Sequence, residues 1–166
     1  MWIPFEELPA HARVWIYQAN RPLSAAEKQT VQDHLEIRIR SWDSHGNAMI
    51  GSSRLLHDRF VVIAADETQQ APSGCSIDQS VGWLRELGNE LGVDFFDRSV
   101  AFLREERLES VPLNALKKHV ELGTIHPQTV VFNHAIGSKA QLDTAWQTAA
   151  KDSWLARYFV ASKLPV

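Results

Sequence analysis

"RFVVIAADE" (residues 59–67) is the stretch that decides the fold of this chain. It is apolar nearly throughout and rich in β-branched residues, which is typical of a central strand covered on at least one face. A weaker stretch, "AMIGSSRLL" (48–56), ends only two residues earlier, and so short a gap predicts a hairpin of antiparallel strands. Further upstream, "RVWIYQA" (13–19) has the same β-branched and aromatic character and predicts another strand.

Two helices are expected, one before this hairpin and one after it. The first begins at Ser24, which can form a capping box with Glu27. The second is expected to begin at Ser76, with Gln79 completing a second capping box, and to end at Gly92. The apolar stripe of the first helix consists of Val31, Leu35, Ile39 and Trp42.

A fourth strand is predicted over "VDFFDRSVAFL" (93–103). The resulting order is β-α-β-β-α-β. With right-handed crossovers it gives an antiparallel sheet in the spatial order 4-1-3-2, with both helices on one face. We therefore predict an α+β fold with a ferredoxin-like core and a C-terminal α/β extension.

The last third of the chain is expected to extend this sheet or to cover its open face. It predicts a helix near 111–122, a strand near 129–135 and a helix near 138–150. A length of 166 residues fits one domain. We expect a single domain over 1–166, with the ferredoxin-like core over about 12–104 and the extension over about 105–166.

Composition bounds the kind of protein. The hydrophobic fraction of 45% and the charged fraction of 22% are ordinary for a soluble globular protein. A net charge of −3 supplies no general attraction for nucleic acid or anionic lipid. No apolar run is long enough to span a bilayer, and the first residues lack the pattern of a secretion signal. We expect a cytoplasmic protein that binds neither membranes nor, on balance, nucleic acid.

The predicted topology brings distant loops to one edge of the sheet. "SWDSHGN" (41–47) precedes the second strand, and the loop over 66–78 joins the third strand to the second helix. The chain that enters the first strand, with His11, ends at the same edge. The candidate site residues gathered there are Arg13, Asp43, His45, Asp66, Glu67, Cys75, Ser76 and Asp78.

Two interpretations of this edge remain open. In the first, Cys75 is a nucleophile, His45 is its base, and Asp66 or Asp43 orients the imidazole. Backbone N–H groups at the helix start would favour a thiolate, although the surrounding carboxylates oppose it. In the second, Cys75 packs as a small apolar residue beside a helix cap, and Ser76 simply caps. The remaining residues of the edge are then candidates for binding rather than catalysis.

Several familiar motifs are absent from the sequence. There is no CxxC and no HxxxH, so we predict neither a metal site nor a cofactor. The Gly-Ser-Lys at 137–139 lacks the earlier glycine of a phosphate-binding loop and is followed by Ala140. The chain is therefore not expected to be a P-loop ATPase. GxGxxG and GxSxG are missing as well.

The sequence resembles a family of small, uncharacterised bacterial proteins. The resemblance rests on segments in matching order, which include "LPAHARVWIYQANRPLSAAEK", "WDSHG", "RFVVIAADE", "SGCSIDQSV", "DFFDR" and "TVVFNHAIGSK". Members are sometimes labelled "ABC transporter ATPase", a label that the missing phosphate-binding loop contradicts. The resemblance implies no particular activity, cofactor or catalytic residue.

These observations favour a binding or interaction module as the function. Its partner would be a protein or a small molecule, and a homodimer formed through a sheet face or an edge strand is one form that it would take. The alternative is a small enzyme that uses the Cys75–His45 pair. A nucleic-acid binder with aromatic residues on the sheet ranks third.

Overall fold

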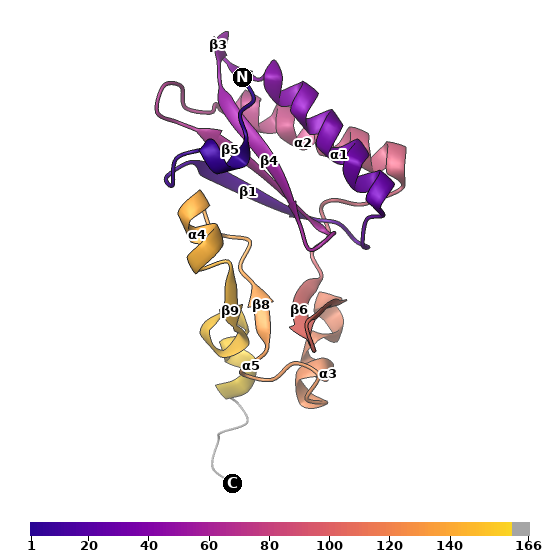
Figure 1. Ribbon diagram of the computed structural model, residues 1–166. Coiled ribbons are helices and arrows are strands. Elements are labelled where there is room, and N and C mark those ends of the chain that lie inside the picture. Colours follow the sequence, from indigo (N-terminus) through magenta and orange to yellow (C-terminus); the bar gives the residue numbers. More distant parts are fainter. Residues whose placement is uncertain (161–166) are drawn as a thin grey trace. The chain divides into compact units, whose positions relative to one another are not determined.

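The computed structural model describes residues 1–160 and divides the chain into two compact units. The first unit comprises Met1–Asp97 together with Ala135–Gln141. The second comprises Arg98–His134 and the chain from Leu142 onward (Figure 1). Each unit has its own sheet and its own apolar core. The single domain expected from the sequence stays a prediction.

The first unit is built on a three-stranded antiparallel sheet. Its strands are β1 (Arg13–Gln18), β4 (Ile50–Leu56) and β5 (Phe60–Asp66), in the order β1-β5-β4. The central strand β5 is buried along almost its whole length, as its apolar sequence predicts. Helices α1 (Ala25–Arg40) and α2 (Gly74–Leu91) lie together on one face of this sheet (Figure 1).

The core of the first unit lies between these helices and the sheet. Val31, Leu35 and Ile39 confirm the helical spacing of the expected α1 stripe, whereas Trp42 lies two residues beyond the end of the helix; all four are buried in this core. Trp42 is at its centre, with its ring packed edge-on against Trp15 and Trp83 at centroid distances of 6.3 and 5.3 Å. Burial of such large aromatic rings is the main stabilising contribution in a unit of this size.

The helix caps follow local sequence chemistry, with one correction. The Ser24–Glu27 capping box of α1 is present, and Gly92 ends α2 in the left-handed conformation with φ of 65°. The expected start of α2 at Ser76 is wrong. Ser73 is the N-cap, and the side chains of Ser73 and Ser76 each accept a hydrogen bond from the other's backbone N–H. Both serines are good caps, and the helix starts at the earlier one.

The predicted fourth strand of this sheet is wrong, and with it the ferredoxin-like order 4-1-3-2. To this sheet residues 93–103 contribute only an isolated parallel bridge between Gln18 and Phe96, and their last four residues belong to strand β6 (Val100–Arg104) of the second sheet. The side chain of Asp94 accepts a hydrogen bond from the backbone N–H of Phe96 at 2.8 Å, which bends the chain in an Asx turn where a strand was expected. What holds is the α+β class with antiparallel sheets.

The second unit contains a four-stranded antiparallel sheet in the order β7-β6-β8-β9. Its strands are β6 (Val100–Arg104), β7 (Arg107–Val111), β8 (Val130–Phe132) and β9 (Gln147–Ala149). Only β8 matches an expected strand closely. The residues expected to form a long helix over 138–150 instead form the short α4 (Lys139–Thr144) and then β9.

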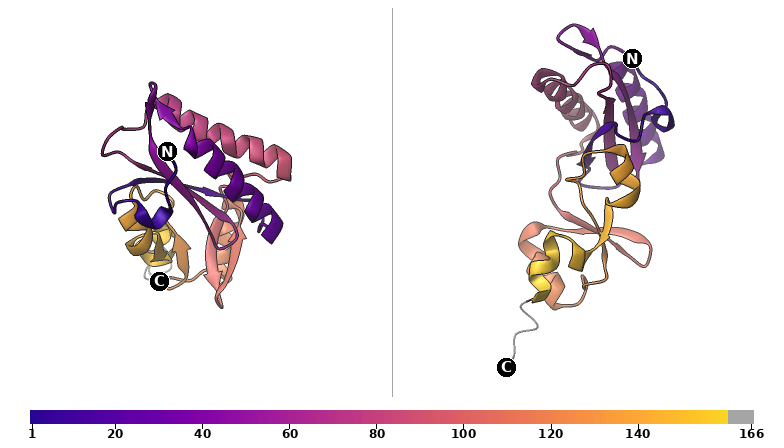
Figure 2. Two further views of the ribbon diagram at one scale, coloured as in Figure 1. Left: turned by 45° about the horizontal axis from the view of Figure 1, so that its top comes forward. Right: turned by 90° about the vertical axis from the view of Figure 1, so that its left-hand side faces the viewer.

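The second sheet is covered by short helical segments. They are η2 (Leu113–Ala115), α3 (Leu116–Glu121), η3 (Ala150–Asp152), η4 (Trp154–Ala156) and α5 (Arg157–Val160). The core beneath them consists of Val100, Phe102, Val111, Leu116, Ile125, Val131, Ala150 and Leu155. Figure 2 shows this unit from two further sides.

Three short elements complete the first unit. They are η1 (Phe5–Glu7), β2 (Asp43–Ser44) and β3 (Asn47–Ala48). No helix among residues 1–160 has both the length and the apolar character that crossing a membrane requires.

Candidate functional site

The predicted edge of the first unit contains a small hairpin that rests against the start of α2. Trp42 joins them, because its indole N–H donates to the carbonyl oxygen of Ser76 at 2.9 Å. At the tip of the hairpin, His45 and Gly46 both have positive φ, at 52° and 82°. Asp43 is engaged within the same turn, since its carboxylate accepts from the Gly46 backbone N–H at 2.9 Å. This carboxylate stabilises the turn locally.

His45 and Cys75 are both exposed on this edge. Cys75 is the second residue of α2, and among residues 1–160 no hydrogen bond joins its thiol to the His45 imidazole. Asp78 is also exposed, and it falls in the second turn because α2 begins at Gly74. The catalytic pair stays a prediction, and no contact described for these two side chains supports it.

Asp66 has partners other than His45. Its Oδ1 accepts from the backbone N–H of Thr68 at 2.9 Å and from the Thr68 hydroxyl at 2.5 Å. The Nε2 of His11 lies 3.1 Å from that hydroxyl oxygen and 3.9 Å from Oδ1. The hydrogen bonds from Thr68, helped by His11, hold the pKa of Asp66 below its usual value. Asp66 therefore stabilises the loop after β5.

Arg13 and Glu67 form an ion pair at the same edge. Their charged atoms lie 3.6 Å apart, and the Arg13 guanidinium also stands 4.9 Å from the centre of the Trp15 ring. Both side chains are substantially exposed, so the pair contributes little to stability. The edge thus gathers most of the expected residue types, but its charged groups are largely paired with one another.

The Gly-Ser-Lys segment has a structural role in the first unit. The Lys139 ammonium donates to the carbonyl oxygens of Glu6 and Leu8, at 3.0 and 2.6 Å. It also stands 5.6 Å from the centre of the Phe5 ring. Gly137 accepts from the backbone N–H of Val14, so this segment lies along the edge of β1. Its lysine fixes the N-terminal segment, a role quite different from that of a phosphate-loop lysine.

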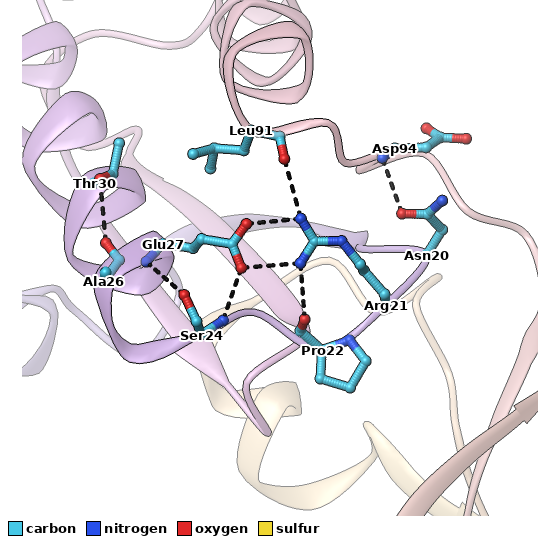
Figure 3. A network of polar contacts seen from close by, with 9 residues as sticks. All are labelled: Asn20, Arg21, Pro22, Ser24, Ala26, Glu27, Thr30, Leu91 and Asp94. Carbon is cyan, nitrogen blue, oxygen red and sulfur yellow. Dashed lines mark hydrogen bonds and ion pairs between the residues drawn. The ribbon is translucent and has the colours of Figure 1, made fainter.

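A further polar network joins the two helices of the first unit (Figure 3). Arg21 donates to both carboxylate oxygens of Glu27, at 2.9 and 2.7 Å, and to the carbonyl oxygen of Leu91 at 3.0 Å. The hydrogen bonds from Arg21 are the main cause that lowers the pKa of Glu27 to about 2. Beside it, Asn20 and Asp94 exchange hydrogen bonds. This network ties the start of α1 to the end of α2.

The second unit contains a cavity of about 520 Å³ with several charged and polar residues in its lining, which sequence reasoning missed. Its lining combines the turn between β6 and β7 with the loop that precedes β8. The lining residues are Leu103, Arg104, Glu105, Glu106, Gly123, Thr124, His126, Gln128, Thr129 and Val130. The sequence carried little signal for it, since a Glu-Glu turn lacks the Asn-Gly or Asp-Gly pair that marks a tight hairpin.

The turn that lines this cavity is strained. Glu105 and Glu106 have φ of 51° and 65°, a conformation that glycine or asparagine adopts more easily. Each such residue costs about 1 kcal/mol or more. Within the part of the chain that the structure describes, neither glutamate carboxylate makes a hydrogen bond or an ion pair. Two negatively charged side chains without a partner therefore line the cavity.

The opposite wall is ordered by local hydrogen bonds. The Nδ1 of His126 accepts from the backbone N–H of Gln128 at 3.2 Å. Thr129, which is buried, accepts from the His126 backbone N–H through its hydroxyl at 2.9 Å. Because Nδ1 is an acceptor, the neutral ring carries its proton on Nε2. His126 is thus a hydrogen-bond donor at the cavity wall.

The charge of the lining is negative. Arg104 is the positive side chain of the lining, and it lies 3.9 Å from Glu109 as well. With His126 neutral, one arginine and two glutamates leave a net charge of −1. No group of three histidine, cysteine, aspartate or glutamate side chains within residues 1–160 could hold a metal ion.

Comparison of the chain with protein-family models, with curated proteins and with solved structures finds no match. The geometry of the two units is therefore the basis for assigning a function.

Proposed function

We propose that this protein is a binding module that holds a small, positively charged molecule in the cavity of the second unit. The observation that carries the proposal is the pair of glutamate carboxylates, Glu105 and Glu106, which line the cavity without a partner. A volume of about 520 Å³ is in the range of ligand sites in proteins. We name the ligand class as a primary amine or diamine.

The lining supports this class. An ammonium group donates three hydrogen bonds, and two adjacent carboxylates can accept them as charge-assisted bonds. The hydroxyl oxygens of the threonines and the side-chain carbonyl of Gln128 are further acceptors in the lining that would fix the orientation of such a ligand. Backbone strain at Glu105 and Glu106 fits a functional turn, because sites often keep conformations that stability alone would not select.

The competing enzymatic function rests on the Cys75–His45 pair in the first unit. That pair lacks a hydrogen bond among residues 1–160, and the carboxylate that would orient it is bonded to Thr68. Binding therefore remains the function that the geometry favours.

Calorimetric titration with 1,4-diaminobutane tests the proposal, with succinate as a probe of similar length and opposite charge. We expect saturable binding of the diamine and none of succinate. Glu106→Gln should weaken binding at least about tenfold, equivalent to about 1.4 kcal/mol. Glu121→Gln, an exposed change on α3 outside the lining, and Cys75→Ser should leave it unchanged.

Either of two results would reject the proposal. One is equal binding of succinate, which would make the charge of the lining irrelevant. The other is an unaltered diamine affinity in Glu106→Gln and in Glu105→Gln.

A further inference from the structure

The edge strand β7 of the second unit differs from the edges of the first sheet. In the first unit, isolated bridges continue both outer strands: Ser138 and Phe96 pair with β1, and Trp2 pairs with Gly51 of β4. In the second unit, no strand among residues 1–160 pairs with the outer side of β7. In the strand order β7-β6-β8-β9, β7 is an outermost strand, and Figure 1 shows its neighbour β6 on the other side of the unit from β9. An open edge is a template for another strand.

The register of the hairpin shows which backbone groups face outward. Because the turn has two residues, Arg104 and Arg107 form the hydrogen-bonded pair next to it, and Phe102 and Glu109 form the next such pair. Leu108 lies between them and pairs with Leu103 without hydrogen bonds. The N–H and C=O of Leu108 therefore point away from β6, at the outer edge of the sheet.

The charges that flank Leu108 are self-complementary. Arg107 precedes it and Glu109 follows it. If two β7 strands pair antiparallel about a two-fold axis at Leu108, Arg107 of each copy faces Glu109 of the other. An axis at Glu109 would instead place that carboxylate opposite its own counterpart, which is unfavourable.

A charge within the hairpin supports the same arrangement. Arg107 lies directly opposite Arg104 on β6, and such like-charged pairs destabilise a sheet. No ion pair of Arg107 occurs among residues 1–160. A second copy would supply Glu109 to this arginine, and within residues 1–160 of its own chain Glu109 has only a 3.9 Å ion pair with Arg104 at the surface. The partner that fits the edge is therefore another copy of this chain.

We propose that β7 is a dimerisation edge: two copies pair β7 with β7, antiparallel about Leu108, and join their four-stranded sheets into one. The inference is independent of the ligand proposed above, because it rests on residues 107–109 and on the open strand. The charges of Arg107 and Glu109 and the register of β7 together select a second copy of this chain as the partner.

Sedimentation velocity over a concentration series of the full chain tests this dimer. Arg107→Glu and Glu109→Arg each place like charges opposite one another, and each should raise the dimer dissociation constant more than tenfold. The double variant, Arg107→Glu with Glu109→Arg, restores opposite charges and should return the constant to near its original value. Lys117→Glu, an exposed reversal on α3, is the matched control and should have no effect.

A backbone variant separates loss of pairing from loss of folding. Leu108→Pro removes the outward N–H, and an edge strand tolerates proline where that group is not bonded within the sheet. It should stay folded by circular dichroism and remain a monomer. A wild-type chain that is monomeric at the highest concentration, a double variant that is not rescued, or a monomer that instead binds an extended peptide of another protein at β7 would each overturn the proposal.

Discussion

The two units use their polar side chains differently. In the first unit, three charged groups that would attract attention in a sequence are bound to neighbours: Asp66 to Thr68, Lys139 to two backbone carbonyls, and Glu27 to Arg21. In the second unit, the two glutamates of the cavity have no such partner among residues 1–160. Residue type alone therefore marks only a candidate, and charged groups that lack a partner and also line a cavity are the stronger sign of a site.

The sheets repeat this contrast at the level of the backbone. Bridges from distant segments continue both edges of the first sheet, whereas β7 leaves one edge of the second sheet unpaired within residues 1–160. A closed unit serves mainly its own stability, and an open one can recruit a partner.

Removing the central ring of the first unit should have the largest effect. Trp42 is 1% exposed, and its indole N–H is bonded to Ser76. Trp42→Ala should lower the free energy of unfolding by about 3–5 kcal/mol, because it leaves a large cavity and removes the hydrogen bond to Ser76. Urea unfolding measures this loss. Trp154→Ala, a change of the same size at a side chain that is 50% exposed, should cost about 1 kcal/mol or less. Equal costs would contradict the assignment of the core.

Acid should distinguish the units next. His134 of the second unit is largely buried and accepts a hydrogen bond on Nδ1 from the Trp146 indole at 3.1 Å. Burial lowers its pKa to about 4, from 6.5 in an unfolded chain. The unfolded chain therefore takes up the proton first as the pH falls. The stability contributed by neutral His134 is complete above pH 6.5 and is lost between 6.5 and 4, by about 3 kcal/mol in all.

Unfolding free energies measured from pH 7 to pH 4 test this prediction. His134→Gln keeps a hydrogen-bond acceptor and removes the titration, so its stability should fall less steeply over that range. Glu27 of the first unit has a pKa of about 2 and stays ionised throughout. If the unfolding free energy of His134→Gln followed the wild-type pH profile, groups other than His134 would cause the acid sensitivity.

Local chemistry predicted the first unit well. The capping box and apolar spacing of α1 lie within consecutive turns, so the sequence displays them directly. The strands β4 and β5 could be predicted because a gap of only two residues between two apolar runs favours a hairpin over other connections. Each of these features depends on neighbours in sequence.

The errors arose where a distant or subtle partner decides the structure. The Asx turn at Asp94 ends what would otherwise be a strand. Beyond Thr144, the backbone carbonyl of Trp146 accepts from the N–H of Asn133, so the expected helix gives way to β9. Asp66 was expected to orient His45, but its carboxylate instead accepts from Thr68 two residues on, a local turn that competes with any longer-range contact. The cavity of the second unit depends on β7, and no strand or hairpin pattern in the sequence predicted that strand.

Substitution of Lys139 tests whether this cation stabilises the fold of the first unit. Lys139→Met retains most of the aliphatic stem but leaves the carbonyl oxygens of Glu6 and Leu8 without their charged donor. The free energy of unfolding should fall by about 2 kcal/mol, as expected for hydrogen bonds to a charged group. Lys151→Met, an exposed change, should cost less than about 0.5 kcal/mol. If the two variants were equally stable, the structural role of Lys139 would be wrong.

The smallest expected effect has the opposite sign, and it concerns the strained turn. Glu105→Asn combined with Glu106→Gly installs the residues that positive φ favours. The double variant should therefore gain about 1 kcal/mol in the free energy of unfolding. It should also lose diamine binding, because it removes both carboxylates from the cavity.

A gain of stability together with a loss of diamine binding in this double variant would indicate that the strained turn serves ligand binding. In the first unit, His57 and Asp58 also have positive φ, at 52° and 55°, but Asp58 pairs with Lys28 at 2.5 Å. His57→Asn with Asp58→Gly should thus gain less, because it breaks that pair, and should leave diamine binding intact. If the Glu105–Glu106 change gained stability and still bound the diamine, strain in the second unit would have no connection with its cavity, and the two units would differ only in how far each satisfies its own side chains.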